Sequence, residues 1–383
     1  MKELIIGIDA SNLLEGGGVT HLEELIRHSN PVVHEFNKIF IWGSKKTLSR
    51  ICDQHWIEKK ENKLLERGLL LRLFWKVIIL RNELKKNNCN ILFSPGGSDI
   101  SNFKPMVTMC RNMLPFEKNE SLRFGYGFKY FKFILLKYFQ SKTFEKANGL
   151  IFLTKYASDI VNKSISIPIK KYKIIPHGIS TKFFIKPRKI SVHNKDKIYN
   201  IIYVSKVDPY KHHINVVEAV SRLVENSYKI NLILIGPRGE SSKKLDQKID
   251  EINKKGKIIE YLGSIPYDLL YQYYKTADIA LFASSCENMP NILLESMASG
   301  LPIACSNKGP MPEILDNCGL YFNPESIDEI YFAISKLIES PILSKAFADK
   351  SFKKVQEFSW EICANSTFNY LNHILKNYNK NEI

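Results

Sequence analysis

The sequence predicts two doubly wound α/β domains, each with a largely parallel sheet covered by helices. Short apolar runs rich in β-branched residues alternate with longer amphipathic stretches, the pattern of parallel strands joined by crossover helices. The chain has 383 residues, more than one hydrophobic core usually supports. A polar, charged stretch at residues 186–197 separates two series of such runs and is interpreted as a linker.

The apolar runs give the expected elements in order. In the first series, strands are predicted at residues 4–8, 39–42, 91–94, 106–109, 150–154 and 173–175, with helices around 64–86 and 123–147. In the second series, strands are predicted at 201–204, 232–235, 258–261, 279–282, 303–305 and 320–322. The resulting domains are 1–186 and 187–357. A last segment, 358–383, is expected to form a C-terminal helix that packs back on the first domain.

The positive charge is concentrated in the first half of the chain. Residues 1–190 carry 33 lysines and arginines against 16 acidic residues, whereas residues 191–383 carry 22 against 23. A lysine-rich coding bias would have made both halves basic. The first half is therefore expected to face an anionic partner such as phospholipid headgroups, a lipid diphosphate or nucleic acid. No nucleic-acid-binding module is recognised, so nucleic acid is not an expected partner.

Cysteine usage and hydropathy favour a cytoplasmic protein. The seven cysteines form no Cys-x-x-Cys pair and have no histidines at metal-ligand spacing, which predicts neither a zinc site nor a disulfide framework. The apolar run near the N-terminus ends at Asp9 and is too short for a signal peptide. The most apolar stretches, 69–80 and 124–139, are interrupted by charged residues, so no segment is expected to span a membrane.

The strongest functional pattern is ENMPNILLESMASGLPIACSNKGPMPEIL, residues 287–315. Glu287 follows a predicted strand, and Glu295 lies in a helix that begins near Pro290 or Asn291. In an open α/β sheet, ligands bind outside the carboxyl ends of the strands, where a helix N-terminus offers N–H groups to an anion. A diphosphate fits there, with Glu287 accepting hydrogen bonds from sugar hydroxyls and Glu295 reaching ribose. Either glutamate alone would more often be a helix cap or an exposed charge.

This segment resembles the retaining glycosyltransferases of family 4, which have the two-domain fold called GT-B, and the resemblance covers nearly the whole chain. In that family two glutamates separated by seven residues, then an apolar helix and a Gly-Leu-Pro turn, form the donor-sugar and ribose site. The resemblance implies two Rossmann-like domains facing across a cleft, with the nucleotide-sugar donor in the second and the acceptor in the first. It also implies front-face transfer, in which the departing phosphate helps to deprotonate the attacking hydroxyl. The sequence shows no dedicated general base.

A second pattern, YVSKVDPYKHH at residues 203–213, places Lys206 and Lys211 where a strand gives way to a helix. Two cations there would neutralise the donor diphosphate without a metal. The pattern resembles the family's Arg and Lys pair, with Lys206 in place of Arg, so that a point charge replaces bidentate phosphate contact. No metal and no cofactor is expected. The donor is a nucleotide-diphosphate sugar, such as a GDP- or UDP-sugar.

The first domain carries weaker patterns. Gly16, Gly17 and Gly18 lie between a strand and a helix, where backbone can approach a phosphate closely. Where many relatives have His-Asp, this chain has Arg111 and then Asn, so Arg111 is either a phosphate contact or a structural ion-pair partner. His177 precedes Gly at the expected hinge, where a purely structural role is at least as well supported as a ligand role.

The resemblance assigns a role to each candidate site residue. The catalytic candidates are Glu287, Lys206, Lys211 and Arg111. The donor-binding candidates are Gly17, Gly18, Ser205, Ile265, Asn288, Met289, Pro290, Asn291 and Glu295. No metal ligands are assigned.

The expected function is hexosyl transfer from a nucleotide-diphosphate sugar to a lipid-diphosphate-linked saccharide, in bacterial O-antigen or capsule synthesis. An anionic membrane surface is an expected partner, with the protein peripheral to the inner face of the plasma membrane. Residues 123–140 mix aromatics with lysines, which suits the headgroup layer or, alternatively, a core helix. Other hypotheses are a nucleotide-sugar epimerase or a phosphorylase on the same fold, and a catalytically inactive partner subunit.

Overall fold

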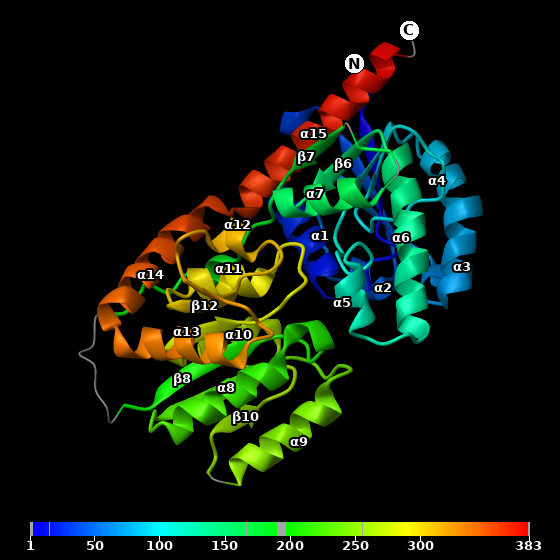
Figure 1. Ribbon diagram of the computed structural model, residues 1–383. Coiled ribbons are helices and arrows are strands. Elements are labelled where there is room, and N and C mark those ends of the chain that lie inside the picture. The colour runs from blue at the N-terminus through cyan, green and yellow to red at the C-terminus, as the bar shows by residue number, and fades with distance from the viewer. Residues whose placement is uncertain are drawn as a thin grey trace. The chain divides into compact units, whose positions relative to one another are not determined.

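The computed structural model describes residues 3–14, 16–165, 167–169, 171–189, 197–254 and 256–381. They form two compact units, each built on its own parallel sheet (Figure 1). Unit 1 comprises Met1–Phe116, Phe131–Gly178 and Phe358–Ile383, and unit 2 comprises Glu117–Tyr130 and Ile179–Glu357. The prediction of two doubly wound α/β domains is confirmed.

Unit 1 contains a seven-stranded sheet in the order β3-β2-β1-β4-β5-β6-β7. Its strands are β1 Ile5–Asp9, β2 Lys38–Gly43, β3 Ile57–Glu61, β4 Ile91–Ser94, β5 Met106–Met109, β6 Gly149–Phe152 and β7 Tyr172–Ile174. The first strands run outward from β1 in one direction, and the strands after β4 run outward in the other. The direction therefore reverses between β1 and β4, which places the loops after these two strands side by side.

The helical segments between these strands are α1 Gly17–Arg27, η1 Pro31–His34, α2 Lys45–Leu48, η2 Lys63–Leu65, α3 Leu69–Phe74, the π-helical η3 Trp75–Leu80, α4 Arg81–Lys86, α6 Phe128–Lys146 and α7 Lys155–Ser164. The predicted helix at 64–86 is thus a helix from Leu69 with a π-helical turn inside it. The predicted helix at 123–147 is shorter, beginning at Phe128 after Gly125 and Gly127.

Strand β3 was missed by the sequence analysis. It reads IEKKE and is half-buried at the edge of the sheet, where it pairs only with β2. An edge strand needs little apolar side-chain surface, since charged residues there also discourage pairing with other chains. The lysines of this segment instead pair with nearby acids, as Lys60 does with Glu58. A search for apolar runs cannot detect such a strand.

Unit 2 contains a six-stranded sheet in the order β10-β9-β8-β11-β12-β13. Its strands are β8 Tyr199–Val204, β9 Ile230–Ile235, β10 Ile259–Tyr261, β11 Ile279–Phe282, β12 Ile303–Ser306 and β13 Leu320–Phe322. All lie within a residue or two of the predicted positions. The helical segments are α5 Lys118–Leu122, η4 Thr181–Phe183, η5 Pro209–Lys211, α8 His213–Glu225, α9 Ser242–Asn253, α10 Tyr267–Thr276, α11 Asn291–Ala298, α12 Met311–Leu315, α13 Ile327–Glu339, α14 Pro341–Lys354 and η6 Val355–Glu357.

The division of the chain differs from the predicted domain boundaries in two places. Unit 1 gives way to unit 2 after Gly178 and not after residue 186, and residues 117–130 group with unit 2 although the sequence analysis assigned them to the first domain. The reason for the second difference is side-chain contact: Phe124 packs on Tyr210, and Arg123 pairs with Glu325. Of the predicted linker, residues 190–196 lie outside the described residues.

The C-terminal segment contributes α15, Trp360–Asn381, which belongs to unit 1 and packs against α1. His34 fixes it from the η1 turn, with its two ring nitrogens 2.9 Å and 3.2 Å from Asn369 Oδ1 and Asn365 Oδ1. Gly178 allows the start of this segment to approach, because a Cβ at residue 178 would lie 2.1 Å from the Trp360 backbone nitrogen. Only glycine fits there without movement of the backbone.

A buried ion pair lies at the carboxyl end of β1. Lys76 Nζ is 2.7 Å from Asp9 Oδ2, and the two side chains are 2% and 0% exposed. Lys76 Nζ also donates to the Ser98 carbonyl oxygen at 2.7 Å, and Asp9 Oδ1 accepts from the Ser11 backbone N–H at 3.0 Å. The pair therefore joins η3 to the loops after β1 and β4, and both charged groups have protein partners.

We expect Lys76→Met to destabilise unit 1 by about 3 to 5 kcal/mol, because it leaves the Asp9 carboxylate buried without its cation. All four tryptophans, Trp42, Trp56, Trp75 and Trp360, lie in unit 1, so urea unfolding followed by tryptophan fluorescence reports on this unit. The matched control is Lys38→Met, which removes an exposed pair with Glu58 and should cost less than about 1 kcal/mol. Equal losses in the two variants would contradict a buried, closed ion pair.

Candidate active site

The predicted site residues of unit 2 gather at the carboxyl edge of its sheet, where the strand order reverses. β8 and β11 are neighbours; the chain continues from β8 outward to β9 and from β11 outward to β12. The loops after β8 and β11 are therefore not separated by a crossover helix, and in open α/β sheets ligands bind in the crevice at this point. Lys206 and Lys211 lie on the first loop and Glu287 on the second.

Lys211 and Glu287 form an ion pair between these two loops. The Lys211 side chain is 8% exposed and that of Glu287 is 16% exposed, so the pair is largely shielded from water while part of the Glu287 side chain stays accessible. The ammonium also lies over the rings of Tyr210 and Phe282, 4.9 Å and 5.7 Å from the centroids. The backbone is held as well, since Tyr203 Oη donates to the Lys211 carbonyl oxygen at 2.6 Å.

A second connection between the two loops was not expected from the sequence. The Ser285 backbone N–H donates to the Tyr210 carbonyl oxygen at 2.9 Å, and Ser285 Oγ lies 2.9 Å from His212 Nε2. Burial, with Arg123 nearby, lowers the pKa of His212 to about 4, so the imidazole is neutral at physiological pH. His212 also has a left-handed backbone, φ 50° and ψ 33°, which turns the chain directly into α8. No motif predicted this role, because the partners are 73 residues apart.

Lys206 is placed differently from Lys211. Its side chain is 49% exposed, and its Nζ is 3.1 Å from Asp208 Oδ2. Asp208 is itself held, since its Oδ1 accepts from the Glu240 backbone N–H at 3.2 Å. One predicted cation is therefore fixed beside Glu287, and the other is a solvated side chain on the same loop.

Residues 288–291 connect Glu287 to α11 and lie mostly below the surface. Asn288 and Met289 are 6% and 7% exposed, and Asn291 begins the helix after Pro290. Its N-cap residue, Pro290, makes no side-chain capping hydrogen bond. The Gly309 loop after β12 lies alongside, because a Cβ at residue 309 would be 3.7 Å from the Glu287 backbone nitrogen. The predicted helix start and its place beside Glu287 are therefore present in the structure.

Glu295 is enclosed more completely than the sequence analysis expected. It is 1% exposed on α11, and Tyr274 Oη donates to its Oε2 at 3.4 Å. Burial raises the pKa of this carboxyl to about 7, although hydrogen bonds from Tyr267 and Tyr274 oppose the shift. Contact with ribose hydroxyls remains a prediction.

Two further donor-binding candidates lie at the same edge of the sheet. Ser205 directly follows β8, and its backbone carbonyl is so close to Gly236 that a Cβ there would be 2.0 Å away. Ile265 lies on the loop after β10, whose Gly263 carbonyl oxygen accepts from the Gly236 backbone N–H at 2.8 Å. Gly236 therefore draws together the loops after β8, β9 and β10.

In unit 1, the Arg111 side chain binds the backbone of the glycine loop, residues 16–18. Its guanidinium donates to the carbonyl oxygens of Gly17 at 2.6 Å and Gly18 at 3.0 Å. Burial lowers the pKa of this side chain to about 10, which leaves it charged at neutral pH. α1 begins at Gly17, and Gly16 before it has a φ of 72°. Arg111 thus positions the loop that was predicted to meet phosphate.

His177 lies in a buried aromatic cluster of unit 1. Its ring stacks on Trp360 with centroids 5.5 Å apart, and His21 meets the same Trp360 edge-on at 5.4 Å. Burial lowers the pKa of His21 well below its usual value, with Arg111 and His177 adding to the shift, so that imidazole is uncharged. These contacts give His177 a packing role beside Gly178, the last residue before unit 2 begins.

Segment 117–130 adds groups to unit 2 that the sequence analysis did not assign. Glu120 accepts a hydrogen bond from Ser285 Oγ and pairs with Arg123, whose Nε is 2.8 Å from Glu120 Oε2. Cys286 Sγ lies 3.4 Å from Glu117 Oε1. Two carboxylates from α5 and the residue before it therefore contact the loop that carries Glu287. Residues 117–120 are far in sequence from residues 287–315, so no local motif indicated these contacts.

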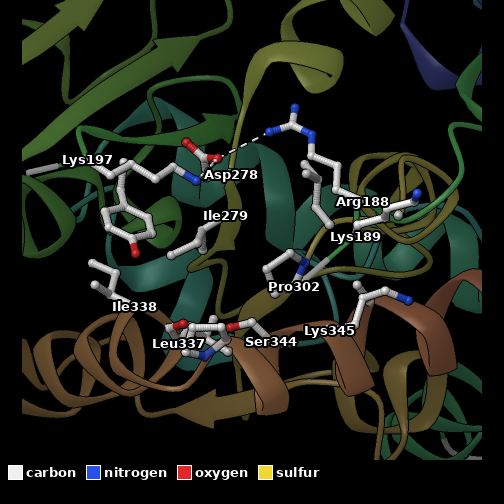
Figure 2. Close-up of a pocket in the computed structure, with 15 residues that line it drawn as sticks. Arg188, Lys189, Lys197, Asp278, Ile279, Pro302, Leu337, Ile338, Ser344 and Lys345 are labelled. Carbon is white, nitrogen blue, oxygen red and sulfur yellow. Dashed lines mark hydrogen bonds and ion pairs between the residues drawn. The ribbon is translucent and has the colours of Figure 1, made fainter. Parts of the chain in front are cut away.

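A pocket of about 200 Å³ lies at the opposite, amino edge of the same sheet (Figure 2). Asp278 and Pro302, which directly precede β11 and β12, line it. Arg188 Nη1 and Lys197 Nζ approach Asp278 Oδ1 at 3.2 Å and 2.7 Å. None of the predicted site residues lines this pocket. Its ion pairs connect Arg188 and Lys197 to Asp278, the residue before β11.

The described part of the chain holds neither a cluster of metal-ligating side chains nor a disulfide. Within it, no three His, Cys, Asp or Glu side chains gather to hold a metal ion. The seven cysteines are free thiols, six of them buried.

Most of the second half of the chain is similar to a known protein family. Residues 185–354 match the family model described as "Glycosyl transferases group 1". These residues are called the group 1 segment below. The group 1 segment contains the predicted site residues of unit 2, from Ser205 to Glu295, whereas Gly17, Gly18 and Arg111 lie outside it.

Two of the similar curated proteins are bacterial glycosyltransferases. The chain is 28% identical over 169 residues to the O-antigen chain mannosyltransferase B of Escherichia coli, covering 44% of each protein. It is 24% identical over 246 residues to the N-acetylgalactosamine-N,N'-diacetylbacillosaminyl-diphospho-undecaprenol 4-alpha-N-acetylgalactosaminyltransferase of Campylobacter jejuni, covering 63% of this chain and 64% of that protein. The matches thus span between about half and two thirds of these relatives.

The fold of the whole chain has solved counterparts. Sucrose-phosphate synthase from Thermosynechococcus elongatus superposes with a TM-score of 0.76 at 15% identity, over 95% of this chain and 97% of that one. The predicted GT-B type of fold is confirmed.

The burial of Glu295 predicts a pH-dependent stability that Glu295→Gln should abolish. Its pKa is about 7 in the folded protein against an ordinary value of 4.5, so the folded state binds this proton more tightly than the unfolded chain. The stabilising effect is complete below about pH 4.5 and is lost as the pH rises through about 7. Between those values the wild type should lose roughly 3 kcal/mol relative to Glu295→Gln. Urea unfolding followed by circular dichroism measures this difference; parallel pH profiles would show that the carboxyl titrates normally.

Proposed function

We propose that this protein is a retaining glycosyltransferase that moves a hexose from a nucleotide-diphosphate sugar to a lipid-linked saccharide. The observation that carries the proposal is the Lys211–Glu287 pair, which lies at the strand-order reversal of unit 2 within the group 1 segment. A cation fixed beside a partly accessible carboxylate suits a ligand that has both phosphate and sugar hydroxyls. Glu287 accepts from the hydroxyls, and Lys211 faces the phosphate charge.

In the proposed reaction the bond between the anomeric carbon and the diphosphate oxygen breaks, and a bond from that carbon to the acceptor hydroxyl oxygen forms on the same face. The hydroxyl proton passes to the departing phosphate. Lys211 and Lys206 stabilise the negative charge that develops on the diphosphate, together with the backbone N–H groups at the start of α11. Lys206 is suited to contact the diphosphate because its side chain is 49% exposed on the same loop.

We further propose that the acceptor is carried on a lipid diphosphate, for a bacterial surface polysaccharide such as O-antigen or capsule. Support comes from the two curated relatives, one named as an O-antigen mannosyltransferase and the other for a diphospho-undecaprenol acceptor. The basic first half of the chain suits an anionic lipid partner. The protein would act in the cytoplasm at the inner face of the plasma membrane. Among the described helices, none is both long and apolar enough to cross a bilayer.

A thermal-shift screen against GDP, UDP, ADP and dTDP, each with its sugar derivatives, identifies the donor. A ligand at about 100 times its dissociation constant should add about 2.7 kcal/mol of stability. Product analysis with the identified donor and lipid-linked saccharides then tests transfer. Conversion of the nucleotide sugar with no acceptor present would indicate an epimerase instead, and dependence on inorganic phosphate would indicate a phosphorylase.

We expect Glu287→Gln and Lys211→Met each to lower the transfer rate by about 10² to 10³, because each removes a charge that contacts the donor. The double variant separates chemistry from structure, since it restores neutrality between the loops and should fold well but stay inactive. Lys257→Gln is the control, a 77% exposed lysine before β10 at the other edge of the sheet. Recovery of activity in the double variant would show that the pair acts only on folding.

Transfer should survive EDTA, because the two lysines take the place of a metal at the diphosphate. The measurement is the initial rate after dialysis against EDTA, with and without added magnesium or manganese. Inactivation that either metal reverses would contradict the proposed role of Lys206 and Lys211.

A further inference from the structure

Helix α6 exposes a row of large apolar side chains to solvent, while two of the three residues that it buries are polar. Within unit 1 it exposes five large apolar residues, Phe131 (64%), Ile134, Leu135, Tyr138 and Phe139. The residues it buries are Gln140, Thr143 and Phe144. A helix on the surface of a soluble domain ordinarily has the reverse arrangement, so this face is suited to contact something apolar outside the chain.

Lysines border the apolar stripe of α6 on both sides. Phe131 and Tyr138 are seven residues apart and therefore share a face, with Leu135 between them. Lys132 follows Phe131, so its side chain is rotated by about 100° about the helix axis to one side of the stripe. Lys137 precedes Tyr138, so its side chain is rotated by about 100° to the other side. The two ammonium groups thus flank the stripe, in the arrangement that lets long side chains reach phosphate while aromatic rings insert beside them.

A second set of exposed apolar side chains lies on α3 and η3. Leu71, Leu73, Phe74, Val77 and Ile78 are exposed, while Trp75 and Leu80 of the same stretch are fully buried. Residues 67–86 also contain six basic residues and one acidic residue, Glu83. This segment repeats the combination found on α6.

One loop holds the two segments together. Lys76 of η3 donates to the Ser98 carbonyl oxygen at 2.7 Å. The next residue, Asp99, donates from its backbone N–H to Thr143 Oγ1 of α6 at 3.1 Å. The connection from β3 to β4 contains α3 and η3, and the connection from β5 to β6 contains α6. Both connections run in the same direction across the sheet, so right-handed crossovers place these helices on one face. Figure 1 shows α3 and α6 together on the side of unit 1 away from α15.

We propose that the face formed by α3, η3 and α6 of unit 1 docks on an anionic lipid bilayer, with its aromatic side chains inserted among the headgroups. The charge supports lipid as the occupant: α6 carries five lysines against one glutamate, Glu145. Protein interfaces are depleted in lysine at their centre, whereas anionic headgroups attract it. The inference rests on the proposed membrane location of the enzyme and not on its chemistry, so lipid binding alone tests it.

The experiment is co-sedimentation of the full-length protein with vesicles of phosphatidylcholine, alone or mixed with phosphatidylglycerol, at low and high ionic strength. The wild type should bind the mixed vesicles and should keep part of its binding at high salt, because insertion of aromatic side chains is not screened. The variant Phe131→Ser/Leu135→Ser/Tyr138→Ser should lose at least about tenfold in binding and most of the salt-resistant part. Lys132→Gln/Lys137→Gln should lose about fivefold per lysine, mainly at low salt.

Matched controls change exposed residues of unit 1 elsewhere. Val32→Ser/Val33→Ser alters two exposed apolar residues of η1, and Lys45→Gln/Lys46→Gln alters two exposed lysines of α2. Both should bind like the wild type. Equal losses in these controls, or unchanged binding by the α6 variants, would overturn the proposed surface while leaving membrane attachment in place. Absence of binding by the wild type would overturn the membrane location itself, and self-association that the serine variant abolishes would identify a second copy of the chain as the occupant.

Discussion

The candidate site depends on the reversal of strand order between β8 and β11. This reversal leaves the loops after both strands next to each other with no crossover helix between them, so side chains 76 residues apart in sequence can meet. Lys211 and Glu287 use that proximity, and Ser285 and His212 reinforce it. The cation and the carboxylate are therefore held in position by the sheet and not by the local conformation of either loop.

Each unit has a buried lysine–carboxylate pair near its point of strand reversal, but the two pairs differ in accessibility. Lys76 and Asp9 are 2% and 0% exposed, so both charged groups are enclosed by protein. Lys211 and Glu287 are 8% and 16% exposed, so part of the Glu287 side chain is open to solvent. Because a fully enclosed pair can fasten loops but cannot take part in binding, the same device is structural in unit 1 and is available for chemistry in unit 2.

The surface of unit 1 is consistent with a partner that is both apolar and anionic. Arg111 is bound to the carbonyl oxygens of the glycine loop. The exposed cations are elsewhere, and those on α6 border aromatic rings that point to solvent. Part of the excess positive charge in the first half of the chain, namely the lysines of α6, therefore lies next to exposed apolar side chains. A partner bound by coulombic attraction alone would not require these exposed apolar side chains.

The sequence by itself determined the fold class, nearly all strands and the segment that carries Glu287 and the start of α11. It could do so because buried parallel strands are continuous apolar runs, and because a strand that gives way to a helix is a local pattern. Lys206 and Lys211 were found in the same way. Strand β3 was not, since an edge strand with charged side chains lacks that pattern.

Only the tertiary structure decided which of these residues meet and which are enclosed. Burial of Glu295 under Tyr274, the hold of Arg111 on Gly17 and Gly18, and the grouping of residues 117–130 with unit 2 all depend on contacts between distant parts of the chain. The apolar stripe of α6 has the same origin: its composition fits a core helix equally well, and only packing determines which face the sheet covers. Sequence periodicity states which residues share a face, whereas the solvent exposure of that face is set by its neighbours.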